Sequence, residues 1–187
     1  MTFDCWRHLK VAHFWLLLRQ RDRAADALRT ALALDPDCAS AASELGHLHG
    51  AQGDYAVATR YLERARTLAP ADGDIAFNLG FVRERAGEHE AAIAAFRDAV
   101  RLNPAIDRAW FGMGLAMAAL GRHAEAAESL EEAARLQPMN PHAFYALAMA
   151  YHSLGRRDKV LKIVERLRGF DPKMTARLEH DVAQPAP

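Results

Sequence analysis

The sequence lacks any excess of charge of one sign. Lys and Arg together number 24, Asp and Glu together also number 24, and the formal net charge is zero. Binding to nucleic acid requires a cationic surface, because contacts with the phosphates supply much of the affinity. Anionic membrane surfaces likewise attract basic segments. The charge balance therefore argues against nucleic acid as the main partner and gives no reason to expect binding to anionic membranes.

Cysteine is also scarce. Only Cys5 and Cys38 occur, and they do not show the spacing of a CxxC metal-binding pair. Two thiols make no disulfide framework of the kind found in small secreted domains. We therefore expect both cysteines to be reduced, which is typical of a reducing compartment, and we expect the protein to be cytoplasmic.

No long hydrophobic run is present. The most apolar stretch, residues 11–18, contains His13 and leads directly into Arg19. It is much shorter than the roughly 20 residues needed to span a bilayer. A signal peptide would have a cleaner apolar core followed by small residues at a cleavage site. We therefore expect this stretch to be a packed helix of the fold, without direct insertion into a membrane.

Motifs that carry catalysis or bind cofactors are missing as well. The sequence contains no nucleophile elbow, no glycine-rich phosphate loop and no HExxH pair of zinc ligands. His13 and His47 come nearest to a metal pair, but a zinc site needs three or four converging ligands. We therefore expect a protein that is not an enzyme and that binds no cofactor or metal.

A strict internal period is present instead. Five of the eight prolines lie 34 residues apart: Pro36, Pro70, Pro104, Pro138 and Pro172. Alanine is very frequent, whereas aromatic residues make up only 8% of the chain, which favours helix over strand. A constant period of this length indicates one structural unit used five times. The units are residues 5–38, 39–72, 73–106, 107–140 and 141–174.

Other positions keep the same period and have physical meanings. Glycine recurs at the fifteenth place, where it ends one helix and turns the chain, because it reaches left-handed dihedral angles at little cost. A small residue at the eighth place, and alanine at the twentieth and twenty-seventh, allow two helices to approach closely. Each unit is therefore predicted to be a helical hairpin. The eighth-place residues are Ala12, Gly46, Gly80, Gly114 and Ala148, and the fifteenth-place residues are Arg19, Gly53, Gly87, Gly121 and Gly155.

These positions resemble the tetratricopeptide repeat family. Trp110 and Phe144 match its aromatic fourth place, and Leu45-Gly46, Leu79-Gly80 and Met113-Gly114 match its seventh and eighth places. The resemblance implies an all-α solenoid, a right-handed superhelix of five hairpins that forms a single domain over residues 1–187. A short helix from Met174 to Ala183 should cover the last hairpin, and residues 184–187 should form a frayed tail.

The resemblance also implies where partners bind. In this family, ligands contact places such as the second, fifth and ninth of the first helix of each unit, which form one stripe on that helix. The candidate binding groove comprises Trp6, Leu9, His13, His47, Asp74, Phe77, Phe81, Arg108, Phe111, Leu115, Tyr145 and Met149.

The ninth place carries the strongest signal. An aromatic at the fifth place is close to the family pattern, so Phe77, Phe111 and Tyr145 could serve packing alone. The ninth place is normally polar, yet units three to five have Phe81, Leu115 and Met149 there. Exposed apolar patches usually mark interaction sites. We therefore expect the groove to bind an apolar peptide or helix of a partner protein, although the chain's own terminal helix or a second copy could fill it instead.

Three functions fit this sequence. The first is a non-catalytic scaffold or adaptor, used as a bacterial assembly factor; the alanine-rich composition with more arginine than lysine favours a bacterial origin. The second is a secretion-type chaperone that shields a hydrophobic client. The third is a structural subunit of a larger complex. In that case a neighbour would bury Trp6, Phe14 and Trp15, and the same N-terminal aromatic helix also offers a surface for self-association.

Overall fold

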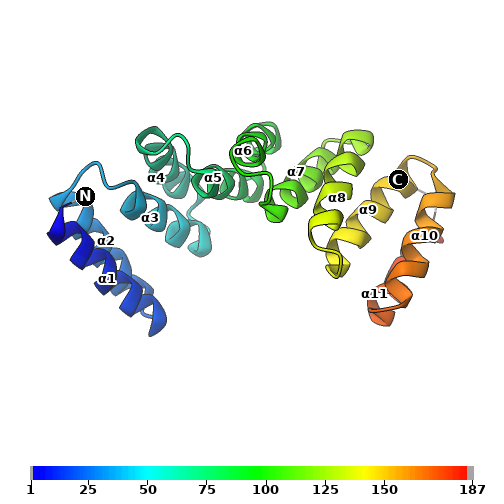
Figure 1. Ribbon diagram of the computed structural model, residues 1–187, viewed down its shortest axis with the longest axis horizontal. Coiled ribbons are helices and arrows are strands. Elements are labelled where there is room, and N and C mark those ends of the chain that lie inside the picture. Colours follow the sequence, from blue (N-terminus) through cyan, green and yellow to red (C-terminus); the bar gives the residue numbers. More distant parts are fainter. Residues whose placement is uncertain (1, 185–187) are drawn as a thin grey trace. The chain divides into compact units, whose positions relative to one another are not determined.

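The computed structural model describes residues 2–184, and every regular element in this range is a helix (Figure 1). The predicted frayed tail falls mostly outside the described residues. None of the described helices is long and apolar enough to cross a membrane. The eleven helices are α1 (Phe3–Leu17), α2 (Arg21–Leu34), α3 (Ala39–Gln52), α4 (Tyr55–Leu68), α5 (Gly73–Arg85), α6 (His89–Leu102), α7 (Asp107–Ala119), α8 (His123–Leu136), α9 (Pro141–Ser153), α10 (Arg157–Arg168) and α11 (Pro172–Val182).

The helices belong to two compact units, residues 1–88 and residues 89–187. In the first unit, α1 pairs with α2 and α3 pairs with α4; in the second, α7 pairs with α8 and α9 pairs with α10. Repeats two to five begin at the first residue of α3, α5, α7 and α9, and the first repeat begins two residues into α1. This agreement confirms the all-α fold of consecutive hairpins. The division falls inside the third repeat, between α5 and α6, and a single domain over the whole chain stays a prediction.

The eighth place of the repeat is where two helices of a hairpin come closest. A Cβ atom added to Gly46 would lie 2.5 Å from Cγ of Leu62, and one added to Gly114 would lie 2.6 Å from Cγ of Leu130. These distances are well inside van der Waals contact, so only glycine fits without a shift of the neighbouring leucine. The prediction that the eighth place is a close-approach position is confirmed in these two hairpins.

The fifteenth place turns the chain between the two helices. Gly53, Gly121 and Gly155 have φ angles of 88°, 73° and 68°, as the prediction required. Arg19 occupies the same place in the first repeat and has a φ of 57°, the one described non-glycine residue with positive φ. A left-handed conformation costs a residue with a Cβ about 1 kcal/mol or more, so the first turn is strained relative to the others.

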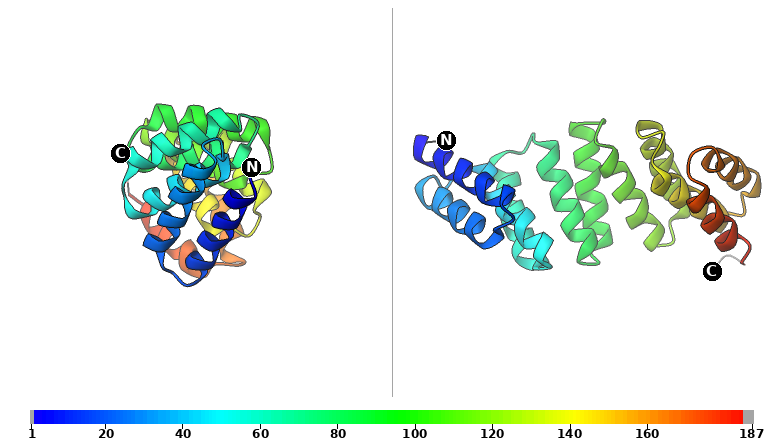
Figure 2. Two further views of the ribbon diagram at one scale, coloured as in Figure 1. Left: turned by 90° about the vertical axis from the view of Figure 1, so that its left-hand side faces the viewer. Right: turned by 90° about the horizontal axis from the view of Figure 1, so that it is seen from below.

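Helix α11 is the predicted C-terminal cap. The carboxylate of Asp171 accepts a hydrogen bond from the backbone N–H of Met174 at its start, and Pro172 occupies the first turn. Figure 2 shows α11 beside α10 in the right-hand view. Leu178 of α11 is fully buried, whereas Lys173, Glu179 and His180 face solvent. The helix therefore covers apolar surface of the last hairpin and presents a polar outer face.

Candidate partner-binding surface

In the first unit, a hollow of about 400 Å³ lies against α5. Phe81, at the ninth place of its repeat, forms part of its wall and is 44% exposed. Helices α3 and α5 approach closely here, because a Cβ added to Gly50 would lie 3.0 Å from Cγ2 of Val82. Gly50 and Ala51, two small residues of α3, line the hollow together with Phe81. His47, predicted as a groove residue, is exposed and also lines this hollow.

Phe77, one turn before Phe81, has a different environment. Its ring centroid lies 6.4 Å from that of Phe81, but only 9% of its surface is exposed. It therefore acts mainly as core and as a support for Phe81. Phe77 thus has the packing role that the sequence pattern allowed as one possibility for aromatic residues at the fifth place.

In the second unit, a separate hollow of about 340 Å³ lies over α7 and α9. The predicted residues Phe111 and Leu115 come from α7, and Tyr145 and Met149 come from α9. Leu115 is 36% exposed, and the other three are half-buried. The structure thus brings these four predicted residues together in one concave, largely apolar surface. A hollow of this kind suits a few apolar side chains of a partner.

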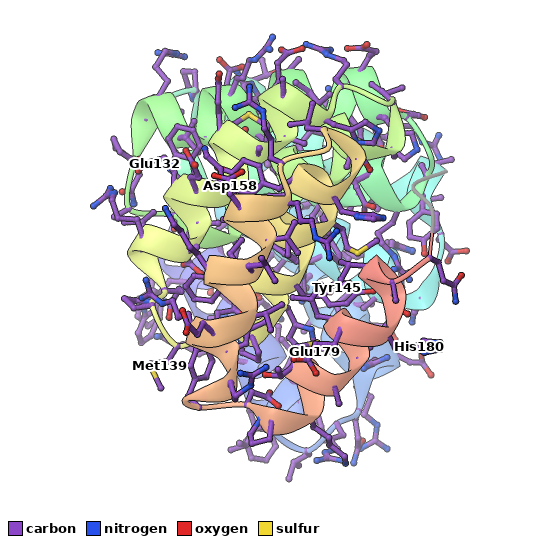
Figure 3. The ribbon with its side chains drawn as sticks, turned by 90° about the vertical axis from the view of Figure 1, so that its right-hand side faces the viewer. Glu132, Met139, Tyr145, Asp158, Glu179 and His180 are labelled. Atoms are coloured by element: carbon purple, nitrogen blue, oxygen red, sulfur yellow. The ribbon has the colours of Figure 1, made fainter. Side chains whose placement is uncertain are left out.

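Helix α11 contributes Arg177 to the lining of this second hollow. The Tyr145 hydroxyl donates a 2.6 Å hydrogen bond to the Asp181 carboxylate, and the Arg177 guanidinium lies 4.8 Å from the centre of the Tyr145 ring. Figure 3 shows Tyr145 between α9 and α11. The hydrogen bond to Asp181 and partial burial raise the pKa of Tyr145 above its ordinary value. The tyrosine edge of the hollow is therefore fixed in place by the C-terminal cap.

On α1, the three predicted groove residues have different environments. Leu9 is buried and belongs to the core, whereas Trp6 is exposed. His13 is exposed too, and its Nε2 lies 2.7 Å from Oε1 of Glu44 on α3. This contact links the first helices of two adjacent repeats within the first unit. The second carboxylate oxygen of Glu44 is buried without a hydrogen-bond partner.

Two predicted residues lie at the beginnings of helices. Asp74 is exposed in the first turn of α5, and Arg108 is exposed in the first turn of α7. Neither lines the hollow of its own unit. Their position suits the outer edge of a binding surface, where charged groups steer a partner more than they add affinity.

Two contributions could not be read from the repeat pattern. Arg177 and Asp181 shape the second hollow from α11, which lies outside the five repeats. Asn78 lines the first hollow from the sixth place of its repeat, which the stripe did not include. The amphipathic pattern of residues 172–182 predicts that α11 caps the last hairpin, but it does not predict which side of that hairpin α11 covers. Among residues 2–184, no cluster of three or more metal-ligating side chains is present.

Comparison with protein families agrees with this geometry. Models described as tetratricopeptide repeat match residues 16–49, 43–105, 82–138 and 117–179. Together these matches run over most of the chain and include parts of all five predicted repeats. No curated protein sequence matches.

Several solved structures share the fold. The structure of MamA protein superposes with a TM-score of 0.82 at 22% identity, covering 98% of this chain and 96% of that one. YrrB, described as a TPR protein with an unusual peptide-binding site, gives 0.81 at 23% identity, with 95% and 92% covered. The pilF protein of Pseudomonas aeruginosa gives 0.82 at 18% identity, with 96% and 83% covered. At these identities the likeness concerns the fold alone.

Proposed function

Because this chain belongs to the tetratricopeptide repeat family, whose members typically serve as binding scaffolds, we propose that it holds an apolar peptide or helix of a partner protein. The binding surface is the hollow over α7 and α9 in the second unit, with the Phe81 hollow of the first unit as a second contact region. The role is non-catalytic, and the scaffold serves as a bacterial assembly factor in the cytoplasm.

The observation that carries the proposal is the exposure of Leu115. Its neighbours on α7 at the eighth and tenth places, Gly114 and Ala116, are buried in the hairpin, whereas Leu115 faces the hollow and solvent. Burying a leucine side chain completely stabilises a protein by about 1.5–3 kcal/mol. The exposed part of Leu115 gives the free protein none of this stabilisation. Because Leu115 is 36% exposed and Phe111 and Met149 are half-buried, a partner that covers them would recover part of this free energy from each side chain on binding.

Two further observations support a peptide ligand. The hollow is concave and has polar groups at its edge, including the Arg177 guanidinium and His142, which can fix the orientation of a bound chain. A protein of the same fold, YrrB, is described as having a peptide-binding site. Helix-in-groove recognition uses apolar anchors with a spacing of three and four residues, and the hollow offers complementary surface for such anchors.

Selection of peptides from a random display library on the purified protein tests the proposal. We expect enrichment of peptides with apolar anchors. Leu115→Glu should weaken binding of a selected peptide by about thirtyfold or more, because an anchor contact commonly carries about 2 kcal/mol. Leu120→Glu is the matched control, since Leu120 is 39% exposed against 36% for Leu115 but lies outside the hollow. Equal affinity of all three proteins, or no enriched apolar peptide, would refute the proposal.

A further inference from the structure

Helix α1 leaves exposed a face that the corresponding helices of the other repeats bury. The seventh place holds Leu45, Leu79, Met113 and Leu147 in repeats two to five, and all four are buried. In the first repeat this place is Val11, which is 39% exposed. The tenth place shows the same contrast, because Phe14 is 53% exposed whereas Leu48, Val82, Ala116 and Ala150 are buried.

The element that covers this face elsewhere is always a helix. Within the first unit, α2 packs on α3 and α4 packs on α5; within the second, α6 packs on α7 and α8 packs on α9. In each case the second helix of one repeat packs on the first helix of the next repeat, and the third, seventh and tenth places of that first helix are buried. The residues of α1 at these places are Arg7, Val11 and Phe14, and their spacing forms one continuous strip. A single helix packed along α1 would cover this strip.

The charges on this strip specify what that helix carries. The third place holds a buried apolar residue in the other repeats, namely Ala41, Ile75, Ala109 and Ala143, but it holds Arg7 in α1. Arg7 is 3.7 Å from Asp4, and both side chains are more than half exposed. The ammonium of Lys10, one turn further on, lies over the Trp6 ring and has no carboxylate partner among residues 2–184. A covering helix would bury both cations with only Asp4 nearby to balance them. Because burial of an unbalanced charge is costly, we expect that helix to supply a carboxylate of its own.

We propose that α1 docks an amphipathic helix of a partner protein, with apolar residues against Val11 and Phe14 and a carboxylate opposite Arg7 and Lys10. This site differs from the hollow proposed above and does not depend on it. A second copy of this chain fits less well. Two α1 helices packed in parallel would bring two Arg7-Lys10 pairs together, and like charges in contact oppose association. In either orientation the second α1 offers only Asp4 as a carboxylate, which already lies 3.7 Å from its own Arg7.

Synthetic helical peptides with one leucine face provide the test. Three versions differ only at two flanking positions, which are both Glu, both Gln or both Lys, and binding is measured by fluorescence anisotropy of the labelled peptide. We expect the Glu peptide to bind about tenfold more tightly than the Gln peptide, and the Lys peptide to bind most weakly, because each of two exposed charge pairs strengthens binding by less than about fivefold. Phe14→Ser should weaken binding of all three peptides.

The charge-swapped variant Arg7→Glu/Lys10→Glu makes the test decisive. Both side chains are exposed, so this variant should keep its helical circular-dichroism spectrum while the order of the three peptides reverses. Equal binding of all three peptides, or an unchanged order in the swapped variant, would overturn the proposal. It would also be overturned by a dimer in analytical ultracentrifugation that Phe14→Ser dissociates, or by Phe14-dependent binding only to phosphatidylglycerol vesicles.

Discussion

The first and last described helices, α1 and α11, differ in the side chains that they turn away from the neighbouring repeat. Each has a neighbouring repeat on one side only. Helix α11 buries Leu178 and Thr175 and presents polar side chains outward. Helix α1 buries Cys5, Leu9 and Ala12, but it presents aromatic and aliphatic side chains outward. Of the thirteen large apolar side chains exposed among residues 2–184, six lie on α1 or at its C-cap: Phe3, Trp6, Val11, Phe14, Leu17 and Leu18.

Within the described residues, the two ends of the array therefore differ in the polarity of their outer faces. A repeat protein needs a polar outer face at its ends to stay soluble, and α11 provides one. The outer face of α1 instead resembles the interior faces of the later repeats, with the addition of two cations. Its apolar side chains are therefore available to a partner, and they contribute little to folding. Matched substitutions at the two ends can test this contrast.

Shortening a buried side chain of the C-terminal cap should have the largest effect on stability. Leu178→Ala removes a fully buried side chain and should lower the free energy of unfolding by about 2–5 kcal/mol. Phe14→Ala, at the other end, removes a larger side chain that is mostly exposed and should change it by less than about 1 kcal/mol. Urea denaturation followed by circular dichroism measures both. Comparable losses of free energy of unfolding in the two variants would mean that the outward side chains of α1 stabilise the fold.

The eighth place offers the next largest effect. Gly114→Ala should destabilise the protein by about 1–3 kcal/mol, because the new methyl group would lie 2.6 Å from Leu130 and force the hairpin apart. Alanine normally favours a helix over glycine by about 1 kcal/mol, so a loss of stability is the opposite of the intrinsic preference. The first and last repeats already accommodate alanine there, at Ala12 and Ala148. An increase in the melting temperature of Gly114→Ala would contradict the close approach.

The turn in the first repeat should respond in the opposite direction. Arg19→Gly places glycine at a φ of 57° and should stabilise the protein by about 0.5–1 kcal/mol, less than the full strain because glycine also loosens the unfolded chain. The reverse change in the last repeat, Gly155→Arg at a φ of 68°, should destabilise by a similar amount. Differential scanning calorimetry would show the two melting temperatures moving apart. Shifts in the same direction would argue against a strained first turn.

The smallest effect concerns how α11 is held. The raised pKa of Tyr145, caused by its hydrogen bond to Asp181 and by burial, means that the folded protein keeps the phenol proton more tightly than the unfolded chain. The stabilisation is therefore fully present below pH of about 10 and is lost as pH rises through the folded pKa. Tyr145→Phe should cost at most about 1 kcal/mol at neutral pH. The gap between variant and wild type should close in alkali, and a constant gap would exclude this linkage.

The sequence allowed the hairpins to be predicted well because their signals are local. Proline, glycine and alanine each act within one turn or one hairpin, so a fixed period located every helix pair. At the ninth place the pattern also identified Phe81 and Leu115, which are exposed. It did not separate Leu9 and Phe77, which are buried, from their exposed neighbours, because burial depends on packing between repeats. The contact of α11 with Tyr145 and the charged strip on α1 depend on tertiary packing in the same way.

The central claim is that the outward apolar side chains of α1 and α7 serve partners and do not stabilise the fold. The free energy of unfolding of the double variant Phe14→Gln/Leu115→Gln, measured by urea denaturation, tests it most directly. The predicted result is a change of less than about 1 kcal/mol from the wild type, as for other exposed positions. A loss of about 3 kcal/mol or more would place both side chains in the core and contradict the claim.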